Sequence, residues 1–84
     1  NPNIIFEVTS KSTEFKDKET KLKIYLQLAS LTDYLIVSQK ESRIEHYQRQ
    51  SQKEWTYRAY TEADEIIRLN SIESQLTVEQ IYRN

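Results

Sequence analysis

The sequence predicts an α/β (α+β) fold, in which a βαβ unit is followed by an antiparallel meander and one main helix packs on a mixed sheet. Two nearly continuous apolar runs, residues 4–8 and 34–38, are predicted strands covered on both faces, and residues 17–29 between them are the predicted helix. Farther along, residues 43–50 and 55–60 each alternate with a period of two, which is typical of half-exposed strands. This order of elements is the one that a βαβ unit with a following meander requires.

The remaining segments are predicted loops, a short strand and a closing helix. Residues 9–16 form a polar loop, and polar turns at 39–42 and 51–54 separate the later strands. Because the chain contains no glycine, tight two-residue hairpins are disfavoured and longer turns are expected. Residues 65–69 are a further short strand. Thr77 is expected to cap a short helix that closes the chain, since its hydroxyl can accept a hydrogen bond from a first-turn N–H group.

Length and composition limit what the chain can be. Its 84 residues amount to one domain at most and make a marginal core. Hydrophobic residues are 37% of the chain, which is low for a globular domain, so the sheet is expected to need packing partners beyond this chain. The chain contains no Met and opens on Asn1, as expected for a fragment of a longer protein.

Residue usage and charge narrow the function classes. The chain has no Cys, which excludes disulfides and thiolate metal sites. No apolar run approaches the roughly 18 residues of a membrane span and no signal peptide is visible, so we expect a cytoplasmic protein without a membrane partner. The net charge of −1 gives no overall basic surface for nucleic acid, so any nucleic-acid contact must be local.

Two charged residues interrupt the apolar pattern of the first strand and of the helix. In an alternating strand, Glu7 shares a face with Ile5 and Thr9. A lone buried carboxylate is costly and needs a cation, a hydrogen-bond partner or a proton. At about 100° per residue, Lys21 projects within the apolar arc of the helix, with Asp17 one turn earlier on nearly the same line. Lys21 is therefore aimed toward the sheet or its edge.

The geometry of a crossover brings these two charges toward the same place. The helix starts near the carboxyl end of the first strand, where Glu7 lies, and Lys21 is about one turn into the helix. In open α/β sheets, ligands tend to bind at that carboxyl edge. The carboxylate and the amine could therefore meet where a ligand would bind.

Short motifs spread along the chain resemble one family of bacterial proteins. The motifs are Pro2, Glu7-Val8, Ser10, Ser12-Thr13, Asp17, Lys21, Tyr25, Ser30-Leu31, Tyr34, Val37-Ser38 and Ile81-Tyr82. Their order and spacing resemble the Uma-two family, whose members have the restriction-endonuclease-like fold of the PD-(D/E)XK nuclease superfamily. The resemblance covers most of the chain but only the later, C-terminal part of a typical family domain. It implies that residues 1–84 are the later part of a single restriction-endonuclease-like domain, with upstream strands and a helix missing.

The resemblance also implies a mixed sheet flanked by helices and a divalent-metal phosphodiesterase site. Glu7 matches the second acidic position of the superfamily and, with the backbone carbonyl of Val8, would bind Mg²⁺, or Mn²⁺ in its place. The lysine that usually follows two residues later is replaced by Thr9. Lys21 on the helix would take over its role, acting on the developing phosphoryl charge or on the attacking water. The residues that would support this site are Asp17, Ser10 and Thr13.

The function implied by the resemblance is that of a Mg²⁺-dependent endonuclease that hydrolyses phosphodiester bonds in DNA. The superfamily's earlier acidic residue would lie before Asn1, so the chain alone is expected to be inactive and the complete protein active. The family often has Leu-Ser-Pro after the Glu-Val pair, where this chain has Thr9-Ser10-Lys11. The alternative is a degenerate nuclease fold that serves as a non-enzymatic interaction or oligomerisation module.

Structural roles would explain the same residues. Glu7 could form a salt bridge with a lysine in the absence of any ligand, and Lys21 could cover apolar surface with its stem while its ammonium reaches water. From the pattern alone the salt bridge is the better explanation of Glu7, and the family resemblance reverses that preference. His46 is the single histidine and is predicted to be a strand residue with no catalytic role.

Aromatic and basic side chains of the later strands could contact nucleic acid. The aromatic ones are Trp55, Tyr57, Tyr47 and Tyr60, and the basic ones are Arg43, Arg49 and Arg58. Sheet packing or a homodimer interface is the better explanation of the aromatic residues, and a cross-strand charge ladder with Glu45 explains the arginines as well.

Overall fold

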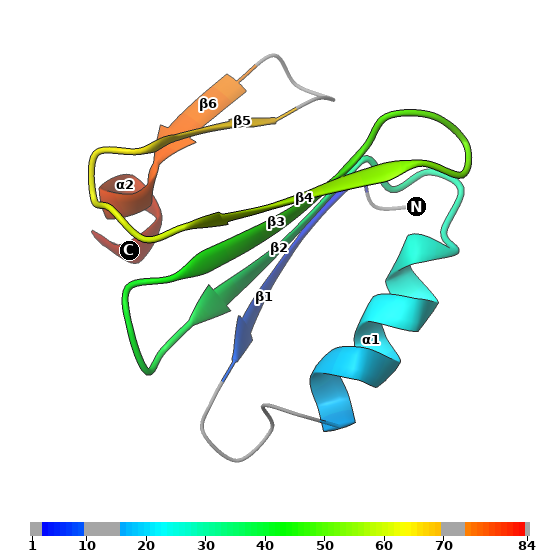
Figure 1. The fold of residues 1–84 in the computed structure, drawn as a ribbon, viewed down its shortest axis with the longest axis horizontal. Coiled ribbons are helices and arrows are strands. Elements are labelled where there is room, and N and C mark those ends of the chain that lie inside the picture. Colours follow the sequence, from blue (N-terminus) through cyan, green and yellow to red (C-terminus); the bar gives the residue numbers. More distant parts are fainter. Residues whose placement is uncertain (1–2, 10–15, 70–73, 84) are drawn as a thin grey trace.

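The computed structural model describes residues 3–9, 16–69 and 74–83 (Figure 1), with side chains from Glu19 onward in the second range. The elements are β1 (Ile4–Thr9), α1 (Lys16–Leu26), β2 (Asp33–Ser38), β3 (Ile44–Arg49), β4 (Trp55–Tyr60), β5 (Ile66–Leu69), β6 (Ser74–Thr77) and α2 (Val78–Arg83). A βαβ unit comes first, and in the described residues four further strands and a closing helix follow it, which is an order of elements typical of the predicted mixed α+β class. None of the described helices is long and apolar enough to cross a membrane.

The first four strands form one mixed sheet in the order β1-β2-β3-β4. β1 and β2 are parallel, with α1 as the crossover between them, and β2, β3 and β4 are antiparallel neighbours. The predicted βαβ unit and the meander are therefore confirmed. Glu7 is paired with Ile36, and Ile36 is paired with Glu45. These three side chains consequently form a row across one face of the sheet.

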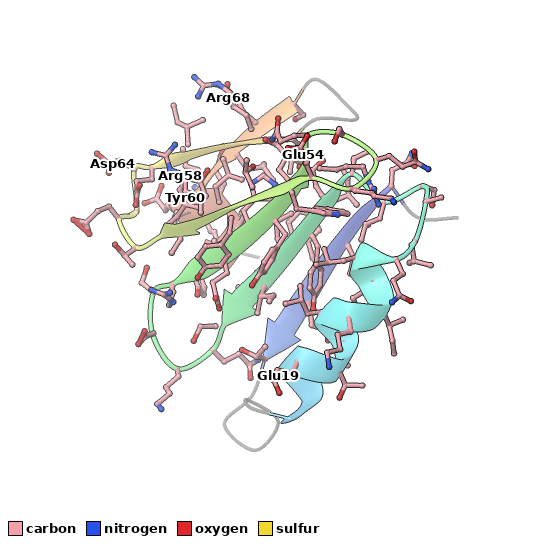
Figure 2. The ribbon with its side chains drawn as sticks, turned by 45° about the vertical axis from the view of Figure 1, so that its right-hand side comes forward. Glu19, Glu54, Arg58, Tyr60, Asp64 and Arg68 are labelled. Atoms are coloured by element: carbon pink, nitrogen blue, oxygen red, sulfur yellow. The ribbon has the colours of Figure 1, made fainter. Side chains whose placement is uncertain are left out.

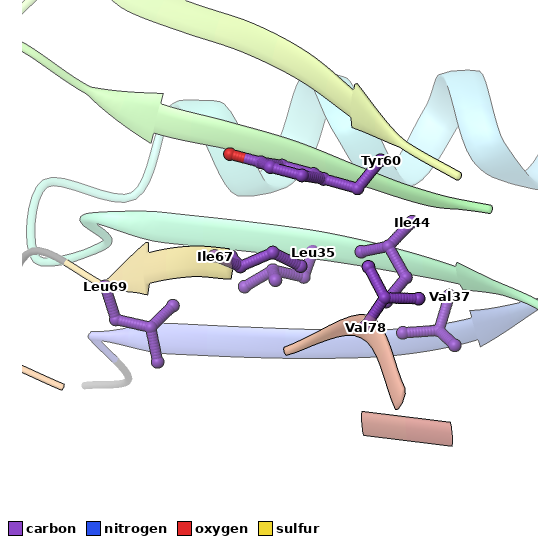
Figure 3. Close-up of a cluster of buried hydrophobic side chains, with 7 residues drawn as sticks. All are labelled: Leu35, Val37, Ile44, Tyr60, Ile67, Leu69 and Val78. Atoms are coloured by element: carbon purple, nitrogen blue, oxygen red, sulfur yellow. The ribbon is translucent and has the colours of Figure 1, made fainter. Parts of the chain in front are cut away.

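The two faces of this sheet are covered by different elements (Figure 1). On the face covered by α1, called the α1 face, Tyr34 and Ile36 of β2 join Leu31 in a buried cluster. The opposite face, called the hairpin face, is covered by the β5–β6 hairpin and α2. Its buried cluster is Leu35, Val37, Ile44, Tyr60, Ile67, Leu69 and Val78 (Figure 3). β2 contributes to both clusters and is buried on both faces, as its unbroken apolar sequence predicts.

β1 differs from β2 although its sequence is equally apolar. Phe6 is 46% exposed and Val8 is 55% exposed, both on the face opposite Glu7. The buried cluster on that face uses β2, β3 and β4 of the sheet, while β1 adds only the partly buried Ile4. Within the described residues β1 also pairs with β2 alone. The prediction that both apolar runs are covered on both faces is therefore right for β2 and wrong for β1.

α1 ends at Leu26, three residues before the predicted end at residue 29. The backbone N–H of Gln27 donates to the carbonyl of Ile24 at 3.2 Å, and that of Leu28 donates to Tyr25 at 3.0 Å. These bonds to the third preceding residue tighten the last turn into a 3₁₀-like geometry. The chain thereby leaves the helix axis early and turns toward β2.

The closing segment contains a strand that the sequence analysis missed. β6 pairs antiparallel with β5, with Ile67 opposite Leu76, although only four residues form the strand. The predicted helix cap at Thr77 is confirmed. Thr77 Oγ1 accepts a hydrogen bond from the Gln80 N–H at 3.1 Å, and Gln80 Oε1 accepts one from the Thr77 N–H at 2.9 Å. This reciprocal capping box lets α2 begin directly where β6 ends.

A buried polar cluster on the hairpin face ties β2 to β3. Asp33 is fully buried, and its Oδ1 lies 2.7 Å from His46 Nε2 and accepts a hydrogen bond from Gln48 Nε2 at 3.1 Å. Asp33 Oδ2 accepts a hydrogen bond from the Thr32 hydroxyl at 2.9 Å. Buried carboxylates are tolerated when several donors satisfy them, as happens here. His46 is therefore a strand residue engaged in packing.

Candidate active site

Glu7 and Lys21, the two residues singled out from the sequence, contact each other. Lys21 Nζ on α1 lies 3.0 Å from Glu7 Oε2 on β1. The contact forms because Glu7 points to the α1 face and Lys21 projects from the side of the helix that faces the sheet. The expected meeting of carboxylate and amine is therefore seen in the structure.

This ion pair is only partly withdrawn from solvent. The side chain of Glu7 is 23% exposed and that of Lys21 is 36% exposed. Ion pairs at such exposure typically contribute about 0–1 kcal/mol to stability, since water screens the attraction. The pair therefore adds little to the stability of the fold, and both groups stay accessible from the surface.

A cavity of about 650 Å³ lies on the α1 face beside this pair. Thr9 and Ser38, the last residues of the parallel strands β1 and β2, line it, and so does Glu19 near the start of α1, which Figure 2 shows beside the end of β1. The cavity is thus at the carboxyl edge of the parallel pair, where ligands bind in open α/β sheets. Its size is within the range of small-molecule pockets. Neither Glu7 nor Lys21 lines the cavity, but Ile36, which is registered beside Glu7, does, so the ion pair lies next to the cavity wall.

A hydrogen-bonded chain of three side chains, from the residue before β3 and from β3 and β4, lines the cavity. Glu45 is only 8% exposed, and its Oε1 accepts a hydrogen bond from the Tyr57 hydroxyl at 2.7 Å. Arg43 Nη2 donates to the Tyr57 oxygen at 3.2 Å. Burial, followed by the hydrogen bond to Glu45, raises the pKa of Tyr57 above that of a free tyrosine. Tyr57 therefore stays a protonated phenol that links a cation to a buried carboxylate.

From the sequence, Arg43 and Tyr57 were possible nucleic-acid contacts and Glu45 a charge-ladder partner, but the three were not joined into one site. Part of this site was visible in the sequence, because the alternation in residues 43–50 places Arg43 and Glu45 on one side of a strand. Tyr47 lies on the same side and also lines the cavity. What the sequence lacked was the information that this side faces α1. A charge ladder between Glu45 and a cross-strand arginine is not what the register gives, since Glu45 is paired with Ile36 and Ala59.

Tyr34 places a buried hydroxyl on the α1 face. Its side chain is fully buried, with the ring edge-on to Tyr25 and stacked on Tyr47. Burial and the negative charge of Glu7 raise its pKa well above that of a free tyrosine, and Glu45 adds to the effect. Among the described residues the hydroxyl has no hydrogen-bond partner. Such a group typically costs about 1–3 kcal/mol, so the α1 face carries an unfavourable polar group that the hairpin face lacks in the described chain.

The side chains of the predicted supporting residues are outside the part of the chain that the structure describes. Ser10 and Thr13 lie outside the described residues, and Asp17 lies in α1 with its side chain outside them. Val8 is registered beside Val37, and the hydroxyl of Thr9 donates to the Val37 carbonyl at 3.4 Å. In the part of the chain that the structure describes, no group of three or more His, Cys, Asp or Glu side chains could hold a metal ion.

The family of the chain follows from its sequence match. The model of the Uma2 (Uma-two) family, described as "Putative restriction endonuclease", matches residues 1–79. The chain belongs to the Uma2 family. The family predicted from the sequence is thereby confirmed. The predicted fold class is confirmed by the mixed sheet and the helices of the structure.

Two relatives and one solved structure of similar fold show how much of a longer protein this chain spans. "Uncharacterized protein slr1290" from Synechocystis sp. is 34% identical over 98% of the chain and 43% of its own length, and "Uncharacterized protein sll1609" from the same organism is 38% identical over 66% and 31%. The fold matches a crystal structure from Anabaena variabilis, described as "a putative nuclease belonging to DUF820", with a TM-score of 0.70 and 15% identity over 98% of this chain and 44% of that one. At 15% identity, this likeness shows the fold alone. The Uma2 chain therefore spans less than half the length of each of these proteins.

Proposed function

We propose that this Uma2 chain is the later part of an endonuclease domain that hydrolyses phosphodiester bonds of DNA with the help of Mg²⁺. The observation that carries the proposal is the 3.0 Å contact between Lys21 Nζ and Glu7 Oε2 beside a cavity at the carboxyl edge of two parallel strands. Membership of a family described as "Putative restriction endonuclease" supports a nuclease activity. Because the chain spans 43% of a full-length relative, the activity would belong to the complete protein.

Glu7 and the carbonyl of Val8 would hold the metal. Mg²⁺ takes oxygen ligands and is usually bound through one or two carboxylates, with water and phosphate oxygens completing its shell. The half-buried carboxylate of Glu7 fits this donor set, and Mn²⁺ accepts the same ligands. Since one carboxylate is at the low end of what Mg²⁺ requires, we propose that a second acidic ligand precedes Asn1. When bound, the metal would polarise the scissile phosphate and supply hydroxide from a coordinated water.

Lys21 would act on the negative charge that develops on the phosphate. A preorganised cation at such a position stabilises the transition state more than the ground state. Its hydrogen bond to Glu7 holds the ammonium of Lys21 toward β1, beside the cavity. Ser10, Thr13 and Asp17 remain predicted supports of this arrangement.

The experiment is metal-dependent cleavage of plasmid DNA by the complete protein and by Glu7→Ala and Lys21→Ala variants. Each variant is expected to lose cleavage in Mg²⁺ and in Mn²⁺, because one lacks the metal ligand and the other the cation on the phosphate. Circular dichroism should show an intact fold. Glu62→Ala and Lys23→Ala, which change exposed residues of the same charge, are the matched controls and should cleave normally. Cleavage retained by either site variant would reject the assignment.

Features of β1 favour a second function. In it, the chain is a non-enzymatic interaction or oligomerisation module built on a degenerate nuclease fold. Thr9 stands where the superfamily usually has a lysine, and the exposed Phe6 and Val8 would suit a protein partner, a second copy of the chain included. Titration calorimetry of the complete protein with Mn²⁺ separates the two. Heat of binding that is lost in Glu7→Gln supports the nuclease, and absence of binding supports the module. The homodimer and the cytoplasmic location remain predictions from the sequence.

A further inference from the structure

We propose that the cavity on the α1 face binds one unstacked nucleotide of the substrate, with its base against the ring of Tyr57 and its phosphate on Arg43. The inference rests on the proposed function in one respect, since it takes nucleic acid as the ligand. It adds a binding site formed by β3, β4 and the turn before β3.

Of the four aromatic residues of β3 and β4 that the sequence singled out, Tyr57 is the one whose ring is most accessible to a ligand. Tyr60 is buried in the cluster on the hairpin face, and Trp55 lies under the guanidinium of Arg49 at 4.3 Å. Tyr47 is half-buried and stacks on Tyr34. Both Tyr47 and Tyr57 line the cavity, but Tyr57 is the more exposed of the two, at 47%. Packing therefore explains three of the four aromatic residues and leaves the fourth with an open ring.

The ring of Tyr57 is held in a fixed position. Its hydroxyl donates to Glu45 Oε1 at 2.7 Å and accepts from Arg43 Nη2 at 3.2 Å. Its ring centroid is 4.9 Å from that of Tyr47. A ring held by two hydrogen bonds and a neighbouring ring loses little conformational freedom on stacking against a base, so stacking is more favourable than on a mobile side chain.

Arg43 supplies the contact for a phosphate. Its guanidinium has five N–H donors and uses one on Tyr57, and among the described residues it makes no further side-chain hydrogen bond. The remaining donors match the geometry of phosphate oxygens. The other basic and polar side chains of this rim, Lys40 and Ser38, come from the end of β2 and the turn that follows it.

The charges of the lining favour a nucleotide over a free phosphate. Glu19, Glu41 and Glu45 line the cavity together with Lys40 and Arg43, so its balance is negative and does not by itself attract an anion. A nucleotide presents an anionic phosphate, a flat aromatic ring and N–H donors on the base. The lining offers a guanidinium, a phenol ring and carboxylates, which are the complementary groups.

A nucleotide could enter this cavity only when it is unstacked. Inside a duplex, both faces of each base are covered by neighbouring bases, so the ring of Tyr57 could not reach one. Proteins that bind bases on aromatic rings therefore take single strands or extrude one nucleotide. The DNA bound here is therefore single-stranded or locally opened at the site.

The experiment measures binding without cleavage. The complete protein is titrated in EDTA into a fluorescein-labelled single-stranded oligonucleotide and into the matching duplex, and anisotropy is recorded at several salt concentrations. We expect tighter binding of the single strand. Tyr57→Ala should weaken it about 5- to 150-fold through loss of stacking, and Tyr57→Phe should keep most of the affinity because the ring remains. Arg43→Gln should lower the slope of log K against log salt concentration by about 0.7 through loss of one phosphate contact.

Arg58→Gln is the matched control. Arg58 is exposed on β4 next to Tyr57 in sequence, but its guanidinium lies over the ring of Tyr60, 5.4 Å from the centroid, on the other side of the strand. It should bind the single strand as the unmodified protein does. Unchanged affinity in both Tyr57→Ala and Arg43→Gln, or equal losses in the Arg58 control, would overturn the inference.

The outcome is separate from that of the proposed function. Cleavage that depends on Glu7 but has an unchanged KM in Tyr57→Ala removes this binding site and leaves the nuclease. Binding of single strands that depends on Tyr57 in a protein that never cleaves removes the nuclease and leaves the site.

Discussion

On the hairpin face of the sheet, seven apolar side chains from five elements pack together, and the one buried carboxylate, Asp33, is surrounded by donors. The α1 face combines a smaller apolar cluster with a cavity, a half-exposed ion pair and the Tyr34 hydroxyl, for which the described residues provide no partner. The two faces belong to the same four strands, so the difference comes from what covers them.

In this small sheet, the hairpin face mainly provides stability and the α1 face provides a surface for binding. The hairpin and α2 close the hairpin face over β2, β3 and β4, while Phe6 and Val8 of β1 stay exposed there. α1 has only 11 residues and covers the Tyr34 region, while the carboxyl edge near Thr9 and Ser38 stays open. A polar group left without a partner is unfavourable for folding, and such groups concentrate where a ligand binds. We therefore expect substitutions on the hairpin face to change stability and those on the α1 face to change function.

The largest effect is expected for Asp33→Ala on the hairpin face. Removing the carboxylate leaves the buried His46 without this partner and takes one of two acceptors from Gln48, and breaking a buried pair typically costs about 3–5 kcal/mol. Urea unfolding of the complete protein, followed by circular dichroism, measures the change. A loss below about 1 kcal/mol would show that this face tolerates unsatisfied groups as well as the α1 face does.

A cavity-forming pair of substitutions tests the same contrast in apolar packing. Ile67→Ala removes a fully buried side chain and should destabilise the protein by about 2–5 kcal/mol. Leu22→Ala, on α1 at the cavity, removes a side chain that is only half-buried and should cost clearly less. Equal losses in the two unfolding curves would contradict a difference in packing between the faces.

Tyr34→Phe should be neutral or mildly stabilising, because it removes a buried hydroxyl that lacks a partner among the described residues. It should also change the alkaline limit of stability. Since burial and Glu7 raise the pKa of Tyr34 in the folded protein, the phenol ionises more readily in the unfolded chain. The stability that this provides is present below about pH 10 and is lost as the pH rises further, so Tyr34→Phe should lose less stability between pH 9 and 12 than the unmodified protein. Parallel pH curves would disprove this.

The smallest effect on stability is expected for Lys21→Met, which keeps much of the apolar stem and removes the ion pair. A pair of this exposure should contribute less than about 1 kcal/mol. If the same variant cleaves no DNA, the α1 face separates function from stability as proposed. A loss of several kcal/mol would instead make Lys21 a structural residue.

Sequence patterns predicted those features that depend on local periodicity. The runs at residues 4–8 and 34–38 and the alternation in 55–60 predicted the βαβ unit and the meander, and Thr77 predicted the cap of α2. The convergence of Glu7 and Lys21 followed from helix and strand periodicity combined with a helix that starts near the carboxyl end of the first strand. These inferences needed only the chain's own spacing.

Features that depend on distant parts of the chain were missed. The burial of Asp33 depends on donors from β3, and β6 exists because β5 offers an edge to four weakly patterned residues. The Arg43–Tyr57–Glu45 chain depends on which face α1 covers. In each case the decisive partner lies on another element, which a pattern within one segment does not reveal.

The outer edge of β1 has a practical consequence for anyone who prepares this protein. Within the described residues its backbone groups meet no further strand, and Phe6 and Val8 stand exposed beside them. Unprotected edges with apolar side chains are templates for strand addition between molecules. A polypeptide of only these 84 residues should therefore precipitate or assemble edge to edge when it is concentrated. A longer expressed polypeptide in which further residues cover β1 should stay monodisperse.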